Sequence, residues 1–239
     1  MSSVLIVSPH RDDAAFSCAI TISVLVKAGV SVIVANCFTV SEYAPFSSPG
    51  RLDVTALRLC EDRSFSVLAG IALNDLSLSD APVRLQSDVS TVFTQRPFTD
   101  MDREPLESIA AHIRGIEKEI TFVPLALGDH IDHRIAQAAA LSTGDPCLAF
   151  YEDLPYAARI PPDAPPRHAF SLSQPLAPYR FSLTDGETWK RRCAALYSSQ
   201  ITPETAREIA AYSCRYGQGE RLWVTPEALA WLNSRQLGT

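Results

Sequence analysis

The pattern of residues 1–38 constrains the fold of this chain more than any other sequence feature. Residues 4–8 form an apolar run of the kind found in strands that are buried on both faces. An amphipathic stretch over residues 14–27 follows and ends at Ala28-Gly29, in the manner of a helix with a glycine cap. Residues 30–38 are again apolar and rich in β-branched side chains. This order predicts a parallel β-α-β unit with a right-handed crossover.

The rest of the chain continues the alternation of strands and helices. We expect strands at 73–78, 120–127 and 147–151, and helices at 52–69, 104–118, 187–197, 203–212 and 226–233, with one more helix ending at 141. Residues 81–102 are expected to form a long polar loop, and the proline-rich residues 155–178 a surface excursion. We therefore predict a single α/β domain over residues 1–239, with a mostly parallel central sheet flanked by helices.

The composition excludes several classes of protein. With 46% hydrophobic and 20% charged residues, the chain is typical of a globular protein. Its net charge of −6 offers no basic surface for nucleic acid, and no apolar run is long enough for a membrane span. The first residues lack a signal-peptide pattern, so a cytoplasmic location is the default expectation. The six cysteines do not have the spacing of a metal site or of a disulfide framework, and they are expected to be reduced core residues. The sequence is also compatible with a homo-oligomer.

Two clusters of histidine and aspartate follow predicted strands directly. One follows residues 4–8 and the other follows residues 120–127; together they contain His10, Asp12, Asp13, His130, Asp132 and His133. The carboxyl ends of neighbouring parallel strands meet at one edge of a sheet, which is where open α/β folds bind their ligands. We therefore expect the two clusters to form one site.

The residue types in this site predict a catalytic metal. A catalytic zinc ion needs three protein ligands with nitrogen or oxygen donors and one open position for water. His10, Asp13 and His133 would supply these ligands for one ion per chain, and the same donors also suit another divalent ion such as Fe²⁺. Two adjacent aspartates cannot easily both face one metal, so Asp12 is expected to act as the general base toward the metal-activated water.

His130 and Asp132 complete the predicted catalytic group. A protonated His130 would stabilise the oxyanion that forms when water attacks an amide carbonyl. Asp132 would hold the His130 imidazole in position, as carboxylates hold histidines in other sites. The sequence thus predicts metal-dependent hydrolysis of an amide bond.

Two stretches carry a resemblance to a known family. Ser8-Pro9-His10-Arg11-Asp12-Asp13-Ala14 and Gly128-Asp129-His130-Ile131-Asp132-His133-Arg134 resemble the paired signatures of the LmbE/PIG-L-like zinc-dependent N-deacetylases. Weaker similarities lie at residues 60–63, 151–156 and 190–200, so the resemblance covers most of the chain.

This resemblance implies a fold, a site and a substrate class. The fold would be Rossmann-like, with zinc held by His10, Asp13 and His133. The roles implied for Asp12 and His130 are general base and electrostatic catalyst. The substrate would be a small N-acylated amino sugar or glycoside, typically an N-acetylglucosaminyl conjugate, from which the N-acetyl group is removed.

The chain departs from the family pattern at Arg11, where many members have proline or leucine. An arginine at the mouth of the pocket would bind an anionic group of the substrate, or would lie solvated on the surface. Arg11 is therefore a candidate substrate-binding residue.

Two other functions stay open. A metal-dependent phosphoesterase also uses histidine and aspartate clusters, but it would bind two metal ions in each chain. A non-catalytic sugar-binding protein with a metal pocket would not need Asp12. Nucleotide binding is excluded, because the first strand leads into carboxylates instead of a glycine-rich turn.

Overall fold

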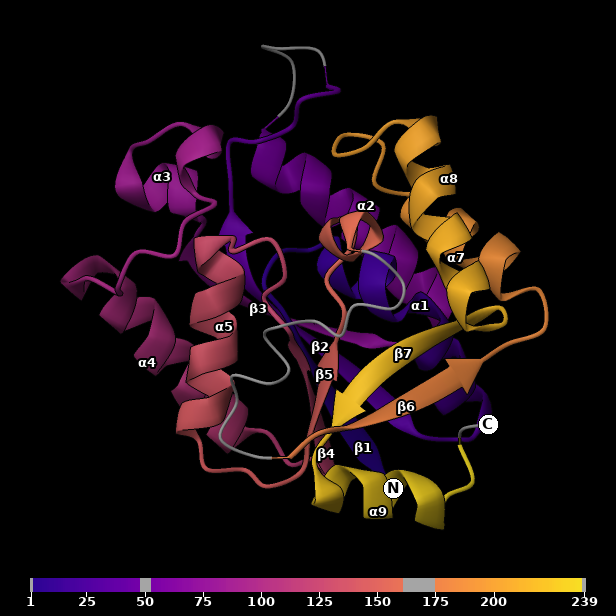
Figure 1. The fold of residues 1–239 in the computed structure, drawn as a ribbon. Helices are drawn as coiled ribbons and strands as arrows, with labels where there is room; N and C mark the ends of the chain where they lie inside the picture. The colour runs from indigo at the N-terminus through magenta and orange to yellow at the C-terminus, as the bar shows by residue number, and fades with distance from the viewer. Residues whose placement is uncertain (1, 48–52, 161–174, 238–239) are drawn as a thin grey trace.

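The sheet at the centre of the structure has seven strands in the order β3-β2-β1-β4-β5-β7-β6 (Figure 1). The computed structural model describes residues 2–47, 53–160 and 175–237. The strands are β1 (Ser3–Ser8), β2 (Ser31–Val40), β3 (Ala72–Ser79), β4 (Ile120–Pro124), β5 (Leu148–Tyr151), β6 (Ala177–Ser182) and β7 (Gly219–Val224). The first five pair in parallel, and β7 and β6 continue the sheet antiparallel. The predicted fold class, a Rossmann-like α/β domain with a mostly parallel sheet, is confirmed.

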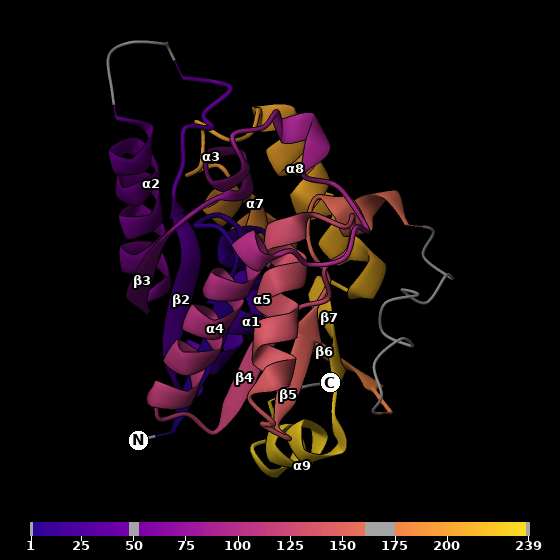
Figure 2. The ribbon, with the colours of Figure 1, turned by 90° about the vertical axis from the view of Figure 1, so that its left-hand side faces the viewer.

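Helices cover both faces of this sheet. They are α1 (Asp13–Lys27), α2 (Val54–Ala69), α3 (Ala81–Leu85), α4 (Asp100–Gly115), α5 (Ile131–Ser142), α7 (Gly186–Ala194), α8 (Pro203–Tyr212) and α9 (Pro226–Ser234). Helices α4 and α5 pack together on one face, while α1, α2, α7 and α8 lie on the other (Figures 1 and 2). This two-sided cover explains why residues 4–7 of β1 are completely buried.

Helix α1 is the most enclosed of the helices that position the site. All of its residues from Asp13 to Ser23 are buried, because it lies between the sheet and the helices α2 and α7. Its sequence is accordingly apolar or small on nearly every side, as in a core helix. The first turn of α1, which carries Asp12 and Asp13, is therefore held firmly against the sheet.

Some elements differ from the sequence prediction. Residues 81–102 contain α3, a short 3₁₀ turn at Val89–Thr91 and the beginning of α4, because Asp80 and Thr99 cap these helices with their side chains. The antiparallel strands β6 and β7 were not predicted. Most of the predicted excursion over 155–178 lies outside the described residues, namely 161–174.

Two further predictions can be compared with the structure, namely the burial of the cysteines and the lack of a membrane span. All six cysteines are free, and Cys18, Cys37 and Cys193 are buried as predicted. Cys60 and Cys214 are exposed, so the expectation that every cysteine is a core residue is wrong. Among the described helices, none combines the length and the apolar character that a membrane crossing requires.

The strand order explains where a site can form. From β1 the chain proceeds outward to β2 and β3, and then returns to β4 on the other side of β1. The carboxyl ends of β1 and β4 therefore lie next to each other at the point where the direction of winding reverses, and ligand sites of open α/β sheets form there. The loops after these two strands, together with the first turns of the helices that follow them, carry the two histidine and aspartate clusters.

Candidate metal centre

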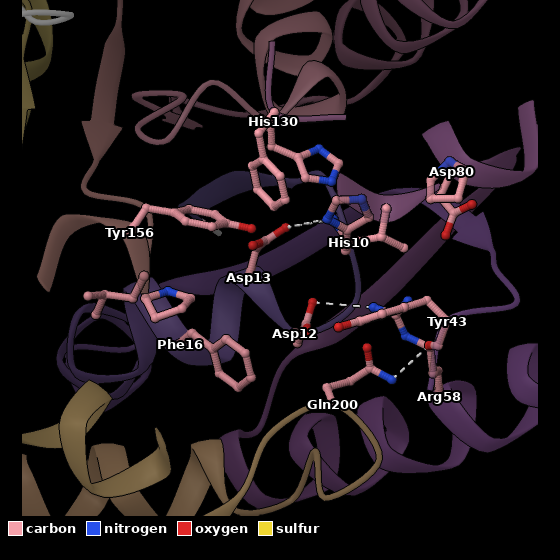
Figure 3. A pocket seen from close by; sticks show the side chains of 15 residues that line it. His10, Asp12, Asp13, Phe16, Tyr43, Arg58, Asp80, His130, Tyr156 and Gln200 are labelled. Carbon is pink, nitrogen blue, oxygen red and sulfur yellow. Dashed lines mark hydrogen bonds and ion pairs between the residues drawn. The ribbon is translucent and has the colours of Figure 1, made fainter. Parts of the chain in front are cut away.

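A pocket of about 140 Å³ opens at this edge of the sheet (Figure 3). His10, Asp12 and Asp13 enter it from the loop after β1, and His130 enters from the loop after β4. The structure thus brings the two predicted clusters together in one site.

The sequence of the second loop explains its tight course. Gly128 and Asp129 both have positive φ angles, of 85° and 59°. A Cβ atom on Gly128 would lie 2.7 Å from the ring of Tyr156, so only glycine fits there. This turn delivers His130 to the N-cap of α5 and His133 to its first turn.

His10, Asp13 and His133 converge as the metal prediction requires. The ligand atoms of the three side chains all lie within 4.8 Å of one another. Asp13 Oδ2 is 3.3 Å from His10 Nδ1 and 3.4 Å from His133 Nε2. The three residues are buried or nearly so, with 5% of Asp13 and 1% of His133 exposed. Two imidazole nitrogens and one carboxylate oxygen form a donor set that suits a divalent metal ion.

Carboxylates orient both histidines from behind. His133 Nδ1 lies 2.6 Å from Asp153 Oδ1, and His10 Nε2 lies 3.2 Å from Asp132 Oδ2. Each contact holds a proton on the outer ring nitrogen, so that the inner nitrogen, which faces the site, is the one that would give up its proton and offer a lone pair to a metal ion. Metal-binding histidines commonly have such partners, so the arrangement supports the metal prediction.

The electrostatics of the site also favour a cation. Burial lowers the pKa of His10, but hydrogen bonds with Asp13 and Asp132 outweigh it and raise this pKa to about 10. Burial raises the pKa of Asp13, yet the charges of His133 and His10 bring it down to about 2. The carboxylates therefore create a strongly negative environment between the two imidazoles, which a divalent cation would neutralise.

Asp12 lies beside these residues in the pocket and points away from them toward Arg58 (Figure 3). Its Oδ1 is 3.4 Å from Arg58 Nη2, and 14% of its side chain is exposed. Although Asp12 is the N-cap residue of α1, its side chain makes no capping hydrogen bond. Burial raises the pKa of Asp12, while the charge of Arg58 opposes this rise. The Asp12 carboxylate thus lies in the pocket beside the cluster and does not cap the helix.

His130 and Asp132 do not interact as the sequence suggested. The backbone N–H of Asp132 donates to His130 Nδ1 at 3.2 Å, whereas the Asp132 carboxylate contacts His10, the backbone N–H of Ala81 and Arg84. The carboxylate that was expected to orient His130 therefore orients His10. The helix start accounts for the difference, because His130 as the N-cap must accept the backbone N–H of α5.

The surroundings of His130 favour a neutral ring over the protonated one that the sequence suggested. Burial, together with the neighbouring His10 and His133, lowers the pKa of His130 well below its usual range. Because Nδ1 accepts a hydrogen bond, the neutral ring carries its proton on Nε2. His130 therefore remains a candidate hydrogen-bond donor to an oxyanion, but as a neutral imidazole.

Arg11 does not line the pocket, so the structure gives no support to the prediction that it binds substrate. Only 3% of Arg11 is exposed, and its guanidinium group forms ion pairs with Asp62 at 3.2 Å and Asp75 at 2.9 Å. The side chain turns away from the pocket and toward α2 and β3, because two carboxylates there compensate the burial of its charge. Arg11 thus joins β1, α2 and β3 behind the site.

Sequence reasoning missed several residues that the structure places at the site. Asp153 follows β5 directly, so the rule that located the other clusters would also have found it. Arg58, Phe93 and Tyr156 line the pocket as well, and they come from a helix and two connecting segments. Tyr156 ends the stretch 151–156 that resembles the family, whereas no local pattern marks Arg58 or Phe93, because only the tertiary fold brings them to the pocket.

The fold and the site together define an α/β protein with a divalent-metal pocket at the winding reversal of its sheet. The family described as PIG-L, GlcNAc-PI de-N-acetylase, matches residues 5–143, which are more than half of the chain and include both clusters. The protein belongs to this family, so the resemblance seen in the sequence is confirmed.

Individual relatives are deacetylases. The 2'-N-acetylparomamine deacetylase of Streptomyces fradiae is 27% identical over 228 residues, which cover 88% of this chain and 78% of that protein. The zinc-inhibited form of teicoplanin deacetylase Orf2 matches with a TM-score of 0.74 and 21% identity, over 93% of this chain and 97% of that chain. N,N'-diacetylchitobiose deacetylase from Pyrococcus horikoshii matches with a TM-score of 0.62 and 17% identity, over 95% and 84% of the two chains. The predicted enzyme class, an N-deacetylase, agrees with the family and with these relatives.

Proposed function

We propose that this protein is a zinc-dependent hydrolase that removes an N-acetyl group from a small substrate containing an amino sugar. The observation that carries this proposal is the convergence of His10, Asp13 and His133 beside a carboxylate, Asp12, that is free of this cluster. The first three residues would hold the ion. Bound there, zinc would acidify a water molecule and polarise the amide carbonyl.

Each remaining polar side chain of the pocket has a task in this reaction. Asp12 accepts a proton from the attacking water, because its carboxylate lies in the pocket and its raised pKa makes it a stronger base. The Nε2–H group of His130 donates a hydrogen bond to the developing oxyanion. The Tyr156 hydroxyl group points into the pocket toward Asp13 and is a second candidate donor (Figure 3).

Aromatic side chains support a sugar as the substrate. Tyr43 and Phe93 line the pocket and are 40% and 44% exposed, so their rings are accessible at its entrance. The Phe93 ring is fixed by edge contacts with His130 at 5.2 Å and Tyr156 at 5.7 Å. Exposed aromatic faces next to a polar pocket suit the apolar face of a sugar ring. An acetylated amino sugar such as the one named for the Streptomyces fradiae relative fits this arrangement.

Two variants test the proposal. Asp12→Asn should retain one zinc ion per chain but release acetate from N-acetylated amino sugars about 10²- to 10⁴-fold more slowly than the wild type. His133→Ala should lose the metal and the activity together. Acetate release by the Asp12→Asn enzyme at the wild-type rate would contradict the role of Asp12. Two ions per chain, with phosphate-ester hydrolysis, would instead favour the phosphoesterase alternative, whereas sugar binding without turnover would favour a non-catalytic protein.

We further propose that residues 1–239 form this one catalytic domain and that it works in the cytoplasm. The continuous sheet, which joins β1 near the beginning of the chain to β7 near its end, supports the first point. The six free cysteines support the second, because reduced thiols persist in reducing compartments. Limited proteolysis and labelling of free thiols in intact cells would test both points.

A further inference from the structure

We propose that Arg84, on helix α3, is a positioning residue that controls the affinity of the metal site through Asp132 and His10. This inference rests on the proposed function, because it assumes that the His10, Asp13 and His133 cluster binds a metal ion. Arg84 itself does not line the pocket, and its effect must therefore pass through another side chain.

The Asp132 carboxylate is completely buried and each of its oxygens has a distinct partner. Oδ2 lies 3.2 Å from His10 Nε2 and accepts the backbone N–H of Ala81 at 2.8 Å. Oδ1 accepts a hydrogen bond from Arg84 Nη2 at 2.9 Å. The two donors other than His10, namely Ala81 and Arg84, thus both belong to α3. This short helix therefore determines how Asp132 faces His10.

Arg84 is itself held from three directions. Its Nη1 donates to the backbone carbonyl of Ser79 at 2.9 Å, and its Nη2 lies 3.6 Å from Asp102 Oδ1. The guanidinium carbon lies 5.1 Å from the centre of the Phe38 ring. With 10% of its side chain exposed, Arg84 is fixed in place and presents a rigid donor to Asp132.

Removal of the guanidinium group would leave Asp132 Oδ1 buried without a charged donor. A carboxylate in that position rotates or recruits water, since an uncompensated buried charge is costly. Each of these responses weakens or misdirects the contact of Oδ2 with His10 Nε2. The His10 ring then loses its fixed orientation, and the metal affinity falls as it does when other partners of metal ligands are removed.

The matched control is Arg96, which like Arg84 contacts Asp102. Its Nη1 is 2.6 Å from Asp102 Oδ2, but its contacts are with Asp102 and the backbone of Pro97 and not with Asp132. A change at Arg96 therefore disturbs the α4 end of the network while leaving both donors to Asp132 intact. If Arg84 acts only by stabilising this region, the two arginines should have similar effects.

The experiment measures Co²⁺ and Zn²⁺ binding to metal-free Arg84→Met, Arg84→Lys and Arg96→Met proteins by competition with a chromophoric chelator. We expect Arg84→Met to lower the affinity on the order of 10-fold, at the lower end of the range for partners of metal ligands. Its visible Co²⁺ spectrum should also change, because the orientation of one imidazole ligand changes. Arg84→Lys, which keeps the charge, should recover part of the affinity, and Arg96→Met should bind and absorb like the wild type.

Two outcomes would overturn the inference. The first is an Arg84→Met protein with native circular dichroism, wild-type affinity and an unchanged Co²⁺ spectrum. The second is an equal loss of affinity in Arg96→Met, which would show a general structural effect. Failure of the wild-type protein to bind either ion would instead refute the metal site of the proposed function, so the two failures are distinguishable.

Discussion

Replacement of Asp153 by asparagine should weaken metal binding although the new side chain has almost the same shape. Both oxygens of Asp153 act as acceptors: Oδ1 contacts His133 Nδ1 at 2.6 Å, and Oδ2 accepts the backbone N–H of Leu127 at 3.0 Å. An asparagine has one oxygen and one NH₂ group, so it can satisfy only one of these donors. The backbone N–H of Leu127 cannot move its proton, and we expect the amide oxygen to remain there.

The NH₂ group of the introduced asparagine would then face His133 and force Nδ1 to become an acceptor. The ring proton moves to Nε2, which is the nitrogen that faces Asp13 and the proposed ion. Metal binding requires a lone pair on that atom, so the ring must change its tautomer before an ion can bind. We expect a loss of about 10- to 100-fold in affinity, or roughly 1.4–2.8 kcal/mol.

Chelator competition measures this loss, and ¹⁵N spectra of the histidine rings report the tautomer of His133. The matched control is Asp145→Asn. Asp145 lies before β5, and Asp153 lies after it. Like Asp153, Asp145 uses both of its oxygens as acceptors, one for the backbone N–H of Cys147 and the other for the side chain of Thr121. The control should lose stability without losing metal affinity. The reasoning is refuted if Asp153→Asn binds zinc like the wild type, or if its His133 keeps the proton on Nδ1.

Three further predictions concern the groups around the site. Arg11→Met should lower the free energy of unfolding in urea by about 3 kcal/mol, since it leaves the buried carboxylate of Asp62 without its charged partner; a raised KM in a protein of unchanged stability would instead support Arg11 as a substrate ligand. Phe93→Leu should raise KM for amino-sugar substrates about 5-fold with little change in kcat, and an unchanged KM would remove the ring from the sugar site. Burial raises the pKa of Asp102, but the hydrogen bonds from Arg96 and Thr99 together outweigh it and hold this pKa below its usual range. Asp102→Asn should therefore cost about 2 kcal/mol of stability at pH 7, and this difference should shrink as the pH falls below about 4; a difference independent of pH would refute that assignment.

The sequence by itself determined the core of the fold and the residues of the candidate metal centre. The strand–helix–strand pattern of residues 4–38 can be recognised from neighbouring residues alone. Parallel strands joined by a right-handed crossover are almost the only arrangement that buries the apolar side chains of both the strands and the helix. His10, Asp13 and His133 could be found because each follows the end of a buried strand, and such ends meet at one edge of the sheet. Asp12 follows from the same pattern.

Only the tertiary structure decided which partner each polar side chain takes. Arg11 is next to Asp12 in the sequence, but its side chain is buried against Asp62. Arg58 is distant from Asp12 in the sequence, yet it lies near Asp12 in the structure and lines the pocket. Asp132 was expected to orient His130, but it orients His10, because the partners Ala81 and Arg84 reach it from a distant helix. Burial makes an unpaired charge costly, so each charged group turns toward whatever partner the packing supplies. That choice depends on contacts between distant segments, which no local pattern records.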